Sequence, residues 1–172
     1  MYILRCAVWI VLLAIAYQDF KFRAVYWWLF VLLMAGLSAL MVLESSAGSI
    51  GTNLLYNGSF LGVQLLFLTL YFSFKQKKLV NIFADYFGLG DLLFLLSITV
   101  YLSFLNYLFF YLFSLLAVIL VSIGSRVLSK NSNPKIPLAG EQAILLLVFM
   151  VVDLLSSSID LTNDWWLTAY LM

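Results

Sequence analysis

Six long apolar stretches limit what this chain can fold into. A membrane-spanning helix needs about 20 apolar residues, with a range of roughly 17–25. The stretches cover residues 3–18, 25–43, 60–74, 92–105, 107–128 and 138–155. A chain of 172 residues is too small to hide six such helices from water. We therefore expect an all-α integral membrane protein, a single domain (1–172) built as a bundle of six transmembrane helices.

The composition removes several classes of function. Hydrophobic residues make up 65% of the chain and charged residues 10%, against about 45–50% and 25% in soluble domains. The net charge of +1 gives no basic patch for nucleic acid. There is no histidine, and Cys6 is the single cysteine, so imidazole mechanisms, disulfides within the chain and multi-thiolate zinc sites are excluded. We expect no metal and no cofactor, and any chemistry must use carboxylates, hydroxyls or lysines.

The basic residues predict how the bundle is oriented. Eight of the nine lie in three alternate loops, after the first and third stretches and between the fifth and sixth, and Arg5 is the exception. By the positive-inside rule these loops are cytoplasmic and both termini lie on the non-cytoplasmic side. We therefore expect a multi-pass protein of the inner (plasma) membrane, with lipid head groups as partners. The loop residues are Lys21, Arg23, Lys75, Lys77, Lys78, Arg126, Lys130 and Lys135.

Two connectors are expected on the opposite side. Residues 44–59 are rich in Ser, Gly and Asn and predict an exposed loop, and residues 104–107 predict a turn. An alternative at the N-terminus is a signal peptide, because Ala14-Ile15-Ala16 matches a cleavage pattern. Only Arg5 would form its basic region, and Lys21 and Arg23 just beyond it resist export, so a retained span is favoured.

Two aspartates are predicted at one membrane depth. Asp19 ends the first stretch and Asp91 begins the fourth, both on the cytoplasmic side. If these helices pack together, the carboxyl groups can meet, and two carboxyls about 3 Å apart share one proton. The ionised carboxylate can then accept a proton from water while the protonated one polarises a carbonyl. This is the logic of aspartic proteolysis.

The sequence Gly88-Leu89-Gly90-Asp91 supports this chemistry, because glycines beside a catalytic Asp let a peptide backbone approach it. The structural alternative is a helix cap at Asp91, with Asp19 an interfacial charge paired with Lys21 or Arg23.

Other acids have simpler interpretations. Asp85 falls in a predicted interfacial helix over residues 79–90, where we expect a solvated face. Glu141 lies in the first turn of the sixth stretch, where a carboxylate suits the helix dipole. Asp153 is near the outer end of that stretch and is expected to be exposed at the interface.

These motifs resemble the prepilin peptidase family of membrane aspartic proteases. The resemblance rests on six spans, an Asp after the first, Gly-x-Gly-Asp at the fourth, and a proline motif, Lys135-Ile136-Pro137-Leu138-Ala139-Gly140, entering the sixth. After Asp19 the chain keeps Arg23 but has Ala24-Val25 in place of the family's Ile-Pro. No Cys-x-x-Cys insertion is present, so the chain looks like the minimal, peptidase-only members. Presenilin-like proteases share Gly-x-Gly-Asp but have more spans.

The resemblance implies a function and a site. Asp19 and Asp91 would be the catalytic pair, with Gly88, Gly90, Arg23 and Pro137 as supporting motif residues. The implied substrate is a type IV prepilin-like membrane precursor, with a short basic leader, a small residue before the scissile bond and an apolar helix after it. Two alternatives stay open: a small transporter or channel subunit with Asp19 and Asp91 as ion or proton sites, and a membrane assembly protein without chemistry. The substrate's identity and the oligomeric state are not predicted.

Overall fold

The protein is all-helical in the computed structural model, which describes residues 1–44, 47–78, 88–128, 138–156 and 159–171. No strand occurs in these ranges. By length and composition, α1, α2, α3, α6 and α7 could each cross a membrane, which fits a multi-pass membrane protein. The helices are α1 (Tyr2–Phe22), α2 (Trp27–Glu44), α3 (Ala47–Gln76), α5 (Leu89–Ile98), α6 (Phe104–Leu128), α7 (Leu138–Leu155) and α8 (Trp165–Leu171).

The fourth predicted span is shorter than expected. Helix α5 has 10 residues and therefore rises about 15 Å, half of the hydrocarbon thickness. The prediction of six full spans is not confirmed. The chain turns at residues 99–103, and α6 already begins at Phe104, so the turn predicted at residues 104–107 is wrong.

The exposed loop predicted over residues 44–59 is also wrong, because residues 47–59 belong to the 30-residue helix α3. The polar residues suggest a loop, but one of them makes buried hydrogen bonds inside the protein. Asn57 is completely buried, and its Nδ2 donates hydrogen bonds to the carbonyl oxygens of Thr99 (2.9 Å) and Leu102 (2.8 Å). Asn57 thereby supplies donors to two carbonyl oxygens of the turn between α5 and α6.

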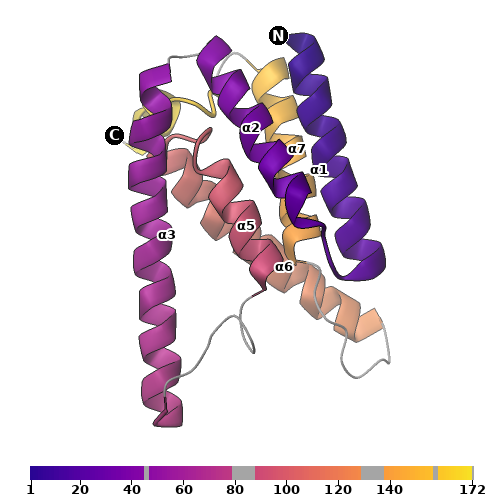
Figure 1. Ribbon diagram of the computed structural model, residues 1–172, viewed down its shortest axis with the longest axis vertical. Helices are drawn as coiled ribbons and strands as arrows, with labels where there is room; N and C mark the ends of the chain where they lie inside the picture. The colour runs from indigo at the N-terminus through magenta and orange to yellow at the C-terminus, as the bar shows by residue number, and fades with distance from the viewer. Residues whose placement is uncertain (45–46, 79–87, 129–137, 157–158, 172) are drawn as a thin grey trace.

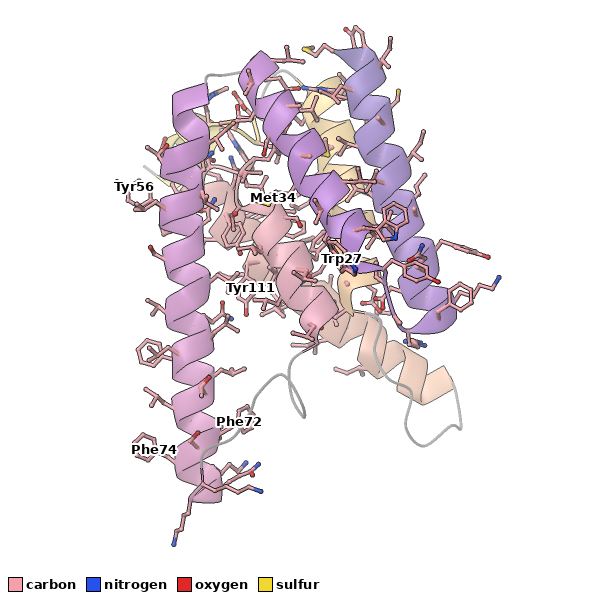
Figure 2. The ribbon with its side chains drawn as sticks, viewed as in Figure 1. Trp27, Met34, Tyr56, Phe72, Phe74 and Tyr111 are labelled. Carbon is pink, nitrogen blue, oxygen red and sulfur yellow. The ribbon has the colours of Figure 1, made fainter. Side chains whose placement is uncertain are left out.

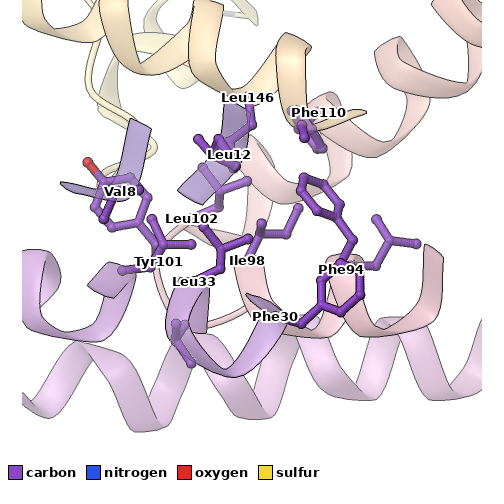
Figure 3. Close-up of a cluster of buried hydrophobic side chains, with 14 of the residues drawn as sticks. Val8, Leu12, Phe30, Leu33, Phe94, Ile98, Tyr101, Leu102, Phe110 and Leu146 are labelled. Atoms are coloured by element: carbon purple, nitrogen blue, oxygen red, sulfur yellow. The ribbon is translucent and has the colours of Figure 1, made fainter. Parts of the chain in front are cut away.

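Helices α1, α2, α5 and α7 form the packed half of the molecule (Figure 1). The buried face of α7 carries small residues, which allow close helix packing in membranes. At Gly140 an added Cβ would lie 3.4 Å from the carbonyl oxygen of Ala16 in α1. Apolar side chains from several helices fill the centre, among them Leu12, Leu33, Phe94, Ile98 and Leu146 (Figure 3).

Helix α3 stands at the edge of this bundle (Figure 1). Tyr56 and Phe74 point away from the other helices (Figure 2), with 59% and 79% of their surface exposed. Large exposed apolar side chains on such a helix fit contact with lipid.

At the end of the bundle that carries the N-terminus, four polar residues form what we call the Arg5 cluster: Arg5, Glu44, Tyr101 and Asp153. Arg5 Nη2 pairs with Glu44 Oε1 at 2.8 Å and with Asp153 Oδ2 at 3.4 Å. The Tyr101 hydroxyl donates to Glu44 Oε2 at 2.9 Å. The predicted interfacial exposure of Asp153 is therefore wrong, since its side chain is only 11% exposed.

The segment after α7 closes the start of α6. Asp164 Oδ1 accepts hydrogen bonds from the backbone N–H groups of Leu105 (3.2 Å) and Asn106 (3.3 Å). These are first-turn N–H groups of α6, so Asp164 caps this helix from 58 residues away in the sequence.

Burial opposes ionisation of Asp160, but hydrogen bonds from Asn163 and Thr162 outweigh it and lower the pKa of that carboxyl.

Candidate active site

Asp19 and Asp91 both meet the N-terminus of α7. Asp19 lies in the last turn of α1 and Asp91 in the first turn of α5. The N–H of Gly140 donates to Asp19 Oδ2 at 2.7 Å, and the neighbouring N–H of Ala139 interacts electrostatically with the Asp91 carboxylate. Two consecutive N–H groups of one helix turn therefore interact with the two carboxylates. Such N–H groups have no partner within the helix and attract negative charge.

The end of α1 fixes where Asp19 lies. Arg23 adopts a left-handed conformation (φ 54°) and its N–H bonds to the Asp19 carbonyl oxygen at 3.0 Å, which terminates the helix. Gln18 Oε1 then accepts a hydrogen bond from the Tyr26 N–H at 3.1 Å. These contacts turn the chain from α1 into α2 around Ala24 and Val25.

The two glycines of Gly88-Leu89-Gly90-Asp91 have different roles. Gly88 is the N-cap of α5, and its N–H interacts electrostatically with the carboxylate of Asp91, which lies in the first turn of that helix. A Cβ added at Gly88 would come within 2.6 Å of Asp91 Oδ2. A Cβ added at Gly90 would make only an ordinary contact, 3.9 Å from Phe30 Cζ. A side chain at Gly88 would therefore collide with the Asp91 carboxylate, whereas a side chain at Gly90 would not, and the approach of a peptide backbone to Asp91 stays a prediction.

A cavity of about 340 Å³ lies in front of the two carboxylates. Its wall combines both acids and Arg23 with apolar groups such as Val25 and Leu138. This volume accommodates water together with part of a peptide. No cluster of three metal-binding side chains occurs among the residues that the structure describes.

The remaining predicted residues divide into three groups. Pro137 and Asp85 lie outside the described residues, as do residues 79–87 of the interfacial helix predicted over residues 79–90. Glu141 is in the first turn of α7, as predicted. Asp153 belongs to the Arg5 cluster at the other end of the bundle.

Sequence reasoning missed the backbone donors at the start of α7. The relevant signal is the Ala139-Gly140 pair directly after the proline motif, because small side chains let a carboxylate reach the N–H groups. At Gly140 an added Cβ would lie 3.2 Å from Asp19 Oδ2. These small residues therefore have a geometric role beside the proline motif.

No protein-family model, no curated protein and no solved structure matches this chain.

Proposed function

We propose that this protein is a membrane aspartic endopeptidase that cleaves prepilin-like precursors at the cytoplasmic face of the inner membrane. The main support is the geometry at α7, where the N–H of Gly140 binds the Asp19 carboxylate and where Asp19 and Asp91 line one cavity together with Ala139. Asp19 and Asp91 are 72 residues apart in the sequence. Aspartic proteolysis requires two carboxyl groups that face one substrate site.

The proposed reaction needs only these two groups and water. One carboxyl is ionised and takes a proton from the attacking water, while the protonated one donates a hydrogen bond to the scissile carbonyl. The water oxygen bonds to the carbonyl carbon and gives a tetrahedral intermediate. Its collapse breaks the C–N bond, and the amine leaves with the proton that the first carboxyl had accepted. The products are a new carboxylate and a new amino terminus.

The ends of the helices support the proposed depth of cleavage. In Figure 1 the ends of α1 and α3 and the starts of α5 and α7 lie toward the end of the molecule opposite the N-terminus. Lys21, in the last turn of α1, is at this end with both aspartates, and α3 extends further in the same direction to Lys75 in its last turn (Figure 1). Positive charge of this kind is typical of the cytoplasmic side. A transporter usually holds its charges near the bilayer midplane, so the end position favours the protease.

The test is a cleavage assay with the full chain in lipid nanodiscs and a designed precursor: a Lys-rich leader, Gly before the scissile bond and about 20 apolar residues after it. We expect cleavage by the parent protein and a loss of about 10²–10⁴-fold in Asp19→Asn and in Asp91→Asn.

Asp160→Asn is the matched control, because Asp160 is a partly buried carboxyl outside the cavity, and it should cleave at the parent rate. Full cleavage by either of the first two variants refutes the assigned pair. Ion flux in liposomes that disappears in Asp19→Asn, with no cleavage by the parent, supports the transporter instead.

A further inference from the structure

A second hollow adjoins the candidate active site. It is a groove of about 300 Å³ between the middle of α6 and the first half of α7, and Phe20 of α1 borders it. Phe20 directly follows Asp19, and Glu141 of the groove directly follows Gly140, which binds Asp19. The groove and the carboxylate site are therefore lined by neighbouring residues of α1 and of α7.

Most of the groove wall is apolar, with Val118, Val121, Ile144 and Leu145 among the lining residues. Two hydrogen-bond acceptors interrupt it at the end nearest Asp19. Gln142 is 1% exposed, and its Nε2 donates to Ser114 Oγ at 3.2 Å. Gln142 Oε1 and Glu141 Oε2 are buried and have no hydrogen-bond partner among the described residues.

Buried acceptors without donors are costly, and the cost rises in a low-dielectric environment. A chain segment that enters the bilayer must be helical, because lipid supplies no hydrogen bonds. The first four N–H groups of such a helix have no partner within it. An apolar helix that starts just after the scissile bond would bring these donors to the depth of Glu141 and Gln142.

We propose that this groove receives the first turns of the substrate's apolar helix, and that Glu141 Oε2 and Gln142 Oε1 accept hydrogen bonds from its free N–H groups. This inference rests on the proposed function, because the aspartate pair sets where the helix begins. The carboxylate of Glu141 also suits the positive end of the helix dipole. The volume takes side chains of a helix that lies along α6 and α7, with the rest of the helix in lipid.

The first experiment maps contact without requiring cleavage. A photoreactive p-benzoylphenylalanine replaces Val121 or Ile144 in the Asp91→Asn protein, in nanodiscs of phosphatidylcholine and phosphatidylglycerol, with the designed precursor as probe. The control position is Leu66 on α3, which is 57% exposed. We expect crosslinks from both groove positions to the first two turns of the precursor helix, and none from Leu66. Adducts with lipid alone, or equal crosslinking at all three positions, overturn the proposal.

The second experiment separates the acceptors from the shape of the groove. Binding of a fluorescent precursor to the Asp91→Asn protein should weaken about tenfold in Glu141→Leu and in Gln142→Leu, because each removes one buried acceptor. Glu141→Gln keeps an acceptor and should bind within about twofold of the parent. Ala117→Trp fills the groove and should weaken binding, whereas Leu116→Trp, at the exposed neighbouring position, should not.

Unchanged binding in Gln142→Leu and Ala117→Trp, with normal elution and melting, refutes the groove. Because both experiments measure binding in an uncleaving variant, their outcome is independent of the cleavage assay. Cleavage with no groove dependence refutes only this inference, and groove binding without parent cleavage refutes only the protease.

Discussion

The buried face of α1 carries one charged residue near each end of the helix, Arg5 and Asp19. The two residues have different surroundings. Arg5 and Asp19 are 14 positions apart by number, which is about 21 Å along a helix and nearly four full turns. At one end Arg5 lies between Glu44 and Asp153, so a cation neutralises acids. At the other end Asp19 joins a second acid, and helix N–H groups stabilise both beside a cavity.

This difference separates a structural cluster from a candidate catalytic one. Breaking a buried ion pair by removal of one partner is strongly destabilising, because the remaining charge stays buried. Two acids at one site repel when both are ionised, so their arrangement costs stability. We therefore expect stability to depend on the Arg5 cluster and cleavage to depend on the aspartates.

The largest expected effect is on cleavage. Asp91→Asn should lower the cleavage rate by about 10²–10⁴-fold and leave the melting temperature unchanged or higher, because the amide oxygen still accepts hydrogen bonds and one buried charge is gone. Cleavage of the designed precursor and thermal unfolding in the same detergent are the two measurements. A variant that loses cleavage only in proportion to lost folded protein would remove the distinction between the two ends.

The second effect is on stability. Arg5→Ala leaves Glu44 and Asp153 without their cation and should lower the free energy of unfolding by about 3 kcal/mol. Cleavage per folded molecule should stay at the parent level. The matched control is the triple variant Arg5→Met, Glu44→Gln, Asp153→Asn, which removes all three charges and should recover most of the loss. Denaturant titration of both variants checks this, and equal stability of Arg5→Ala and the parent would contradict the structural role.

The third effect compares the two glycines of one motif. In Gly88→Ala the new Cβ would lie 2.6 Å from Asp91 Oδ2, so the carboxylate must move. This change should lower the cleavage rate about tenfold or more. Gly90→Ala meets only Phe30 Cζ at 3.9 Å and should cleave at nearly the parent rate. Initial rates of both variants at equal folded concentration give the answer. If Gly90→Ala is the more damaged of the two, the assigned geometry around Asp91 is wrong.

The smallest effect concerns the end of α1. Arg23 has a φ of 54°, a conformation that costs non-glycine residues about 1–2 kcal/mol. Arg23→Gly should therefore be about 1 kcal/mol more stable than Arg23→Ala. The two variants lack the same charge, so any difference in thermal unfolding comes from the backbone. Identical melting curves would show that this turn is not held in the left-handed conformation.

Much of the helical arrangement follows from the sequence, because apolar runs of bilayer length have few other structures. The range 138–155 matches α7 at both ends. The errors lie where polar residues serve internal contacts. Asn57 resembles a loop residue but satisfies a buried turn, and Asp153 resembles an interfacial charge but pairs with Arg5. Single-sequence patterns carry no information about such partners, which are 42 or more positions away.

The candidate site was partly predictable for the same reason. Shared depth and the glycine motif are local features, and they selected Asp19 and Asp91. The donors at Ala139 and Gly140 are backbone groups, which every residue except proline has, so side-chain patterns do not reveal them. The unpaired acceptors of Glu141 and Gln142 also depend on which helix lies opposite, and this is set by tertiary packing.

The central claim is that carboxyls from α1 and α5 act together on one peptide bond. The most direct test is an experimental structure of the full chain in nanodiscs with a precursor peptide whose scissile bond is replaced by a hydrated difluoroketone, which mimics the tetrahedral intermediate. We predict that both hydroxyl oxygens of the hydrate lie within about 2.5–3.0 Å of carboxylate oxygens. These contacts should come from Asp19 and from Asp91. A hydrate that contacts only one of these residues, or neither, would contradict the account.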